Sequence, residues 1–175
     1  MELKDTLKAP YTPVQELNFY SINNDIKHYV IVRTSEGLEA WGDTAEEYLE
    51  KLKIAKYNEA NLKAKSYIDS GDALFEFEEG KHVEATDGNI GKFTGYALDY
   101  VSGRRPASSK VEWNTKEDEN VELTQEQVYF ILDGLGRVQA FIWTVQFPAY
   151  MQAIQEAQTK EEVIAIEIVY TSDIN

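Results

Sequence analysis

Apolar residues in the second half of the chain recur every three or four positions, the period of an α-helix that buries one side. Thr124 precedes this stripe and Gln127 follows three residues later, which is the spacing of a capping box at a helix start. Because proline cannot continue a regular helix, we expect Pro148 to kink or end it near Gln146 or Phe147. The stripe consists of Val128, Ile131, Leu132, Leu135, Val138, Ile142 and Val145.

Three further segments have helix-start signals. Residues 43–70 carry acids early and lysines later, which complements the helix dipole. Residues 86–101 predict a helix despite their glycines, and a short helix is expected after residue 159. The expected caps are Asp43 or Thr44, Thr86 or Asp87, and Thr159. The apolar side of the second helix is expected to hold Ile90, Phe93, Ala97, Leu98 and Val101.

Alternating apolar and polar residues predict short antiparallel strands elsewhere. We expect two or three strands between Gln15 and Trp41 and a hairpin around the turn "EEGK". A second hairpin is expected where "KVEWNT" pairs with "NVEL". The final residues, "EIVYTSDIN", could be extended and pair with a strand.

These elements predict an α+β fold: a small N-terminal antiparallel sheet, a linking helix, and a C-terminal domain of β-hairpins packed on helices. The expected parts are an arm at 1–13, a small β-module at 14–42, the linking helix at 43–70 and the α+β domain at 71–175. Pro10 and Pro13 favour an extended arm, lying along a neighbouring subunit or along its own domain.

Charge narrows the possible partners. The chain has 175 residues and a net charge of −14, which argues against nucleic acid and against anionic membrane surfaces. No apolar run approaches transmembrane length, and no signal peptide is evident, so we expect synthesis in the cytoplasm. The absence of cysteine excludes disulfides and thiolate zinc sites.

Catalytic chemistry is hard to assemble from these residues. The two histidines, His28 and His82, lie far apart within strand patterns, which favours partly exposed strand residues over a catalytic or metal pair. The segment "GNIGKFTG" contains Gly-Lys but lacks the spacing of a phosphate loop, because Phe93 follows the lysine. We therefore expect a protein that is not an enzyme and has no cofactor, no metal and no catalytic residues.

The acidic stretch "NTKEDEN" does not match a calcium loop in spacing and has no glycine, so a polar hairpin turn is the simpler interpretation. Its acids could still contact a basic partner, and we take Glu117 and Asp118 as candidate interface residues. Tryptophan and tyrosine are favoured at interfaces but serve equally in cores. The remaining candidates are Pro10, Tyr11, Pro13 and Trp41.

The order of motifs from about Leu52 to Ile168 resembles a bacteriophage domain of unknown function, found near the C-terminus of tail-fibre-associated and other tail proteins. That family has a basic helix, an "F-x-F/Y-x-G" hairpin, a tryptophan segment ending in "L-T", and an ending like "I-x-x-A-x-T-x-E-E-V-x-A-I". The residues at those places are Phe75, Phe77, Gly80, Trp113, Leu123, Thr124, Ile154, Ala157, Thr159, Glu161, Glu162, Val163, Ala165 and Ile166.

The resemblance implies a structural virion protein of the tail or tail fibre, made in the host cytoplasm and acting through protein–protein contacts. Its expected partners are other phage structural proteins, in an oligomeric assembly. The resemblance equally permits a tail-fibre assembly chaperone. A third alternative is a glycan- or receptor-binding module, which would need exposed tryptophan or tyrosine.

Overall fold

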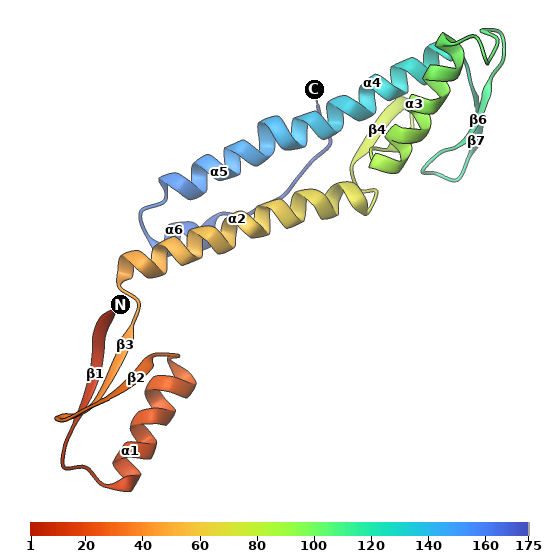
Figure 1. The fold of residues 1–175 in the computed structure, drawn as a ribbon. Helices are drawn as coiled ribbons and strands as arrows, with labels where there is room; N and C mark the ends of the chain where they lie inside the picture. The colour runs from red at the N-terminus through yellow and green to blue at the C-terminus, as the bar shows by residue number, and fades with distance from the viewer. Residues whose placement is uncertain (175) are drawn as a thin grey trace. The chain divides into compact units, whose positions relative to one another are not determined.

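The computed structural model describes residues 1–174 and divides into two compact units, Met1–Ile54 and Ala55–Asn175 (Figure 1). Helices account for 53% of the chain and strands for 20%. Every strand pair in the described residues is antiparallel, and the strands form three small separate sheets. The predicted α+β fold is confirmed.

The N-terminal unit is a three-stranded sheet with one helix against it (Figure 1). Its strands are β1 (Glu2–Lys8), β2 (Val30–Thr34) and β3 (Gly37–Gly42), in the order β1-β3-β2. The helix α1 (Pro13–Tyr20) packs on one face of the sheet through Phe19. The core of this unit consists of Phe19, Leu38 and Ala40.

Two of the strands expected between Gln15 and Trp41 are present, β2 and β3, but the first part of that segment is helical: it forms α1 and then a π-helical stretch, η1 (Ser21–Ile26). Thr12 and Gln15 form a complete capping box, and Pro13 occupies the first turn, where its missing N–H has no helical partner to lose. The N-terminal segment lies along its own unit, which is one of the two positions expected for the arm, and residues 2–8 of it form the edge strand β1 paired with β3.

The linking helix is α2 (Ala45–Asp69), which begins in the N-terminal unit and ends in the C-terminal unit. Thr44 and Glu47 cap it reciprocally: each main-chain N–H donates to the other residue's side-chain oxygen, at 2.9 and 3.1 Å. This is one of the two cap assignments that the sequence allowed.

The C-terminal unit contains two hairpins and a run of helices (Figure 1). The hairpins are β4 (Leu74–Glu78) with β5 (Lys81–Glu84), and β6 (Val111–Asn114) with β7 (Asn120–Leu123). The helical elements are α3 (Asp87–Val101), α4 (Gln125–Phe141), η2 (Ile142–Gln146), α5 (Phe147–Glu156) and α6 (Lys160–Ala165). The helix α4 packs against both α3 and β4, so its apolar stripe forms the centre of the core.

Close approach of β4 to α4 depends on a glycine. The ring of Phe75 lies so near Gly134 that a Cβ there would be 2.2 Å from it. The same ring contacts Phe130 on α4 at 5.4 Å between centroids. The neighbouring Gly136 has open space where a side chain would point. The absence of a side chain at Gly134 therefore allows β4 to pack closely on α4, whereas Gly136 has no such role.

Pro148 neither ends nor visibly interrupts the helical path. The chain passes from α4 through the π-helical η2 into α5, with Pro148 in the first turn of α5. A π-helical stretch changes the hydrogen-bond spacing ahead of the proline, so the proline's missing N–H and its ring are accommodated. The helix therefore does not end near Gln146 as expected; its hydrogen-bond pattern changes over Ile142–Gln146 and the helical path continues.

The C-terminal tail does not pair with a strand in the described residues, contrary to the expected pairing. It lies between α2 and the η2–α5 region and is held by side-chain hydrogen bonds on both sides (Figure 1). Tyr170 donates to the carbonyl of Ala60 at 3.0 Å, and burial raises the pKa of Tyr170 to about 12. Gln146 both donates to and accepts from the main chain of Thr171.

Candidate functional site

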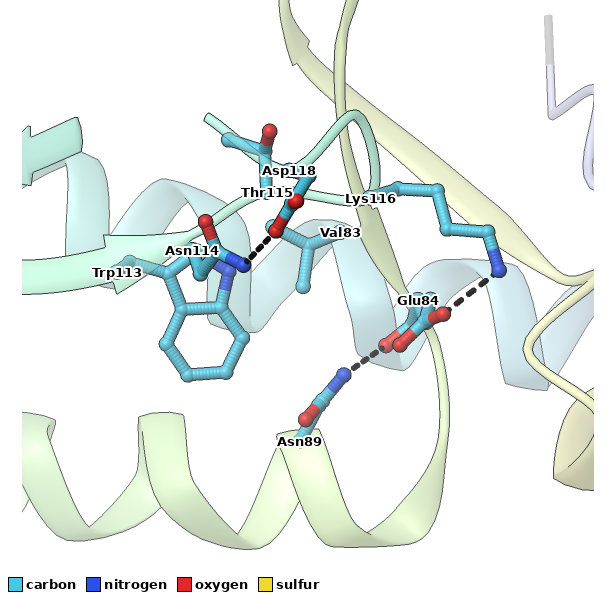
Figure 2. Close-up of a pocket in the computed structure, with 8 residues that line it drawn as sticks. All are labelled: Val83, Glu84, Asn89, Trp113, Asn114, Thr115, Lys116 and Asp118. Carbon is cyan, nitrogen blue, oxygen red and sulfur yellow. Dashed lines mark hydrogen bonds and ion pairs between the residues drawn. The ribbon is translucent and has the colours of Figure 1, made fainter. Parts of the chain in front are cut away.

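The acidic turn between β6 and β7 lies against β5 and borders an open pocket of about 400 Å³ (Figure 2). The pocket is formed where three elements meet: the end of β5, the start of α3, and the β6–β7 hairpin. Figure 2 shows side chains from all three elements directed toward the same space. The residues that line the pocket are Val83, Glu84, Asn89, Trp113, Asn114, Thr115, Lys116 and Asp118.

Several contacts between the turn and β5 meet at His82. The main-chain N–H of His82 donates to Glu117 Oε2 at 3.0 Å, and its carbonyl accepts from the N–H of Lys116 at 3.0 Å. Glu117 Oε1 also lies 2.8 Å from Nδ1 of the His82 ring. We refer to this set of contacts among His82, Lys116 and Glu117 as the hairpin clamp.

The electrostatics of the clamp favour an ionised Glu117. The hydrogen bond from the His82 main chain, followed in importance by the His82 side chain, lowers the pKa of Glu117 to about 2. Lys116 Nζ lies 2.7 Å from Glu84 Oε1, and that carboxylate raises the pKa of Lys116. Glu117 and Lys116 are therefore both engaged by groups of β5.

Glu117 and Asp118, the two acidic residues predicted to contact a partner, both form hydrogen bonds within the chain but with different groups. Glu117 uses both carboxylate oxygens on His82, so the group expected to contact a basic partner already has an internal partner. Asp118 accepts a hydrogen bond from the Asn114 side chain at 2.7 Å and has a φ of 65° (Figure 2). That left-handed conformation is one that Asp tolerates in turns.

The pocket has the character of a structural junction. The Nδ2 of Asn89 donates to the carbonyl of Glu84, and Trp113 contacts Phe93 at 4.7 Å between ring centroids. Lys92 lies over the Trp113 ring at 5.4 Å, so a ligand would have to compete with that ammonium group for the indole. Within residues 1–174, no group of three or more His, Asp or Glu side chains is placed to hold a metal ion.

The other candidates lie in the N-terminal unit. The hydroxyl of Tyr11 accepts a hydrogen bond from Arg33 at 2.6 Å, and Arg33 also pairs with Glu16. Pro10 and Pro13 are exposed, at the entry to α1. They are distant in sequence from the hairpin clamp and belong to the other unit, so the candidates do not form one site.

Trp41 marks the side of the sheet that α1 does not cover. On β3, Leu38 and Ala40 are buried with Phe19, so the alternation of a strand places Trp41 on the opposite face. The strand register sets Trp41 between Leu3 of β1 and Val30 of β2. Val32 is on the same face, beside Glu39. We call the set Leu3, Val30, Val32 and Trp41 the open face.

A second exposed apolar set follows the outer side of α1 and η1. Its members are Val14, Leu17, Ile22 and Ile26, and Leu17 is 69% exposed. The strands predicted from Gln15 onward do not anticipate this set, because its members lie on two helical elements. The Thr12–Gln15 capping box was the signal that could have revealed it.

Comparisons with protein families, curated proteins and solved structures return no match. Among the described residues, no helix combines the length and apolar character needed to cross a membrane.

Proposed function

We propose that this chain is a structural protein of a bacteriophage virion, located at the tail or tail fibre, that acts through protein–protein contacts and not through catalysis. The motif resemblance over residues 52–168 supplies the phage tail setting. The observation that supports a contact role is the apolar surface of the N-terminal unit. Monomeric proteins seldom leave contiguous apolar patches uncovered, and such patches commonly mark interaction sites.

The N-terminal unit is the part that would bind other subunits. Its two apolar surfaces, the open face and the outer side of α1 and η1, lie on either side of a core of three buried apolar residues. A unit with so small a core gains stability when a partner covers those surfaces. The C-terminal unit contributes the rigid body to which this contact module is attached through α2.

Mass spectrometry of purified particles tests the location. A structural protein should be present at a fixed ratio to known tail subunits after extensive purification. Presence during infection but absence from mature particles would favour the alternative, a fibre-assembly chaperone, which also needs exposed apolar surface. If the chain instead bound glycans on an array, and if that binding required Trp41, the receptor-binding alternative would replace both.

A pair of substitutions tests whether the exposed apolar residues of α1 contact other subunits. Leu17→Glu places a charge on the outer side of α1, where the side chain is already in water, so folding should be retained. We expect this variant to lose incorporation into particles. Val101→Glu, at a position 77% exposed in the C-terminal unit, is the matched control and should be incorporated normally. Equal incorporation of the two variants would count against the N-terminal unit as the contact module.

A further inference from the structure

The two outer edges of the N-terminal sheet differ in how they are protected. Exposed strand edges attract other strands, and proteins usually block them with charges, lysines or bulges. The edge strand β1 is protected in each of these ways. It has a register shift between Leu3 and Asp5, and four of its seven residues are charged, two of them lysines. The other edge strand, β2, has an unbroken register from Val30 to Thr34 and the sequence "VIVRT".

The single charge on β2 is turned away from a strand that would approach along this edge. Arg33 is directed to Glu16 and Tyr11, on the side of the sheet that α1 covers. From Lys27 to Thr34 the chain has no acidic residue, although its net charge is −14. The strand β2 therefore has no register shift and no acidic residue; besides β3, the element that packs against it is η1, which precedes it in the chain.

We infer that β2 pairs antiparallel with β2 of a second copy of this chain, around a two-fold axis at Val32. Val32 is the middle residue of β2, so only this register lets all five residues of each strand find a partner. It places Arg33 opposite Ile31 of the other copy, so that no like charges face each other. The two sheets join into one with six strands.

The same pairing is complementary in charge and in apolar surface. It brings the β2–β3 turn of one copy, which carries Glu36, to the end of the other β2 that follows Lys27 and His28. The two open faces become continuous, and Val30 and Val32, which are 51% and 42% exposed, gain neighbours across the new strand pair. This deepens the assembly role proposed above by naming one partner of the N-terminal unit as the chain itself.

Cysteine cross-linking of the full chain tests the register directly. The chain has no cysteine, so a disulfide formed by Val32→Cys can report only this position. Residues opposite each other in an antiparallel pair have Cα atoms about 4.5–5.5 Å apart, which is within disulfide reach. Thr6→Cys, on the same face but at the β1 edge, is the matched control. We expect a covalent dimer from Val32→Cys and none from Thr6→Cys.

Substitution of Val32 by charged residues tests the pairing a second time, through the mass of the protein in solution. We expect the unmodified chain to have the mass of a dimer by light scattering, and Val32→Lys and Val32→Glu each to have half that mass. Mixing the two variants should restore the dimer, because opposite charges then meet at the axis. A monomeric unmodified chain, equal cross-linking at both cysteines, or no rescue on mixing would each overturn the pairing.

These results are separable from the proposed function. A chain that dimerises through β2 but is absent from virions would contradict the virion role and leave the pairing intact. A chain that is incorporated into virions but remains monomeric in solution would do the reverse.

Discussion

The two units of this chain differ in whether their apolar residues are buried or exposed. The N-terminal unit buries three apolar residues and leaves ten of the eighteen large exposed apolar side chains in water, although it is less than a third of the chain. The C-terminal unit buries the other twenty-one and has one continuous core cluster running from α2 to the tail. The difference shows that burial is extensive in one unit and slight in the other, and it is the observation behind the contact role proposed for the N-terminal unit.

Polar contacts join distant segments of the C-terminal unit: the hairpin clamp fastens β6–β7 to β5, and Tyr150 exchanges hydrogen bonds with Val169 of the tail. Unsatisfied polar groups do not separate the two units, because each has one such buried side-chain atom among the described residues: Oδ1 of Asn23 in the N-terminal unit and Nε of Arg105 in the C-terminal unit. The contrast between the units therefore lies in their apolar residues.

The contrast between the two units is tested most strongly at Leu38. Leu38→Ala removes the larger aliphatic side chain from a core of three residues, at a cost of about 2–5 kcal/mol. We expect the N-terminal unit to unfold while the C-terminal unit stays folded, as measured by hydrogen exchange of β3 against that of α4. Leu17→Ala, at an exposed position, should change neither. Cooperative loss of both units would show that they are one folding unit.

Gly134 tests the packing of the C-terminal unit in the same way. Gly134→Ala drives a methyl group into the Phe75 ring, and such overpacking costs about 1–3 kcal/mol. Gly136→Ala, two residues along the same helix and facing open space, should stabilise by about 0.5–1 kcal/mol through helix propensity. Urea unfolding of each variant measures both values. Equal effects would contradict the close approach of β4 to α4.

The same capping box occurs in both units and allows a matched pair of substitutions. Thr12 and Thr124 each accept from the N–H of a glutamine three residues later, and each glutamine reaches back. Replacing either threonine by alanine should cost about 1 kcal/mol. Because the N-terminal unit has less stability to lose, Thr12→Ala should raise its exchange rates in native buffer more visibly than Thr124→Ala raises those of α4. The reverse order would mean that the small unit is the more stable one.

The capping boxes also show how far the sequence alone could lead. The sequence predicts the start of α4 at Thr124 and that of α2 at Asp43 or Thr44, because cap chemistry is local and falls ahead of a clear apolar stripe. Thr12 has the same chemistry, but the exposed apolar residues of α1 do not form a buried stripe after it, and the sequence predicts strands from Gln15 onward. Periodicity rules assume that apolar residues are buried, so they do not predict a helix whose apolar residues are exposed.

The prediction of which side of α3 is buried was wrong at its C-terminal end, where aromatic and aliphatic residues compete for the core. On α3, Leu98 and Val101 were expected inside and are exposed, while Tyr100 is buried and donates to the carbonyl of Ser109. A tyrosine can bury its ring and still satisfy its hydroxyl, so it took the inner position. The hairpin clamp lay beyond prediction because His82 and Glu117 are 35 residues apart.

The smallest expected effect concerns acid sensitivity of the hairpin clamp. The pKa of Glu117 in the folded chain is lowered to about 2 from an ordinary value of 4.5, so its contribution to stability is fully present above pH 4.5. That contribution should be lost as pH falls from 4.5 toward 2, because protonation weakens the carboxylate as an acceptor for His82. We expect exchange of the His82 amide to rise in this window while α4 remains protected.

Two glutamine variants separate the clamp from general acid effects. Glu117→Gln removes the titrating group, so the opening of β6–β7 should no longer depend on pH in this window. Glu112→Gln, an exposed position on the same hairpin, should leave the dependence unchanged. A loss of pH dependence in the Glu112 variant, or its persistence in the Glu117 variant, would assign the acid sensitivity to another carboxylate. Either result would weaken the contrast between a self-closed C-terminal unit and an open N-terminal one.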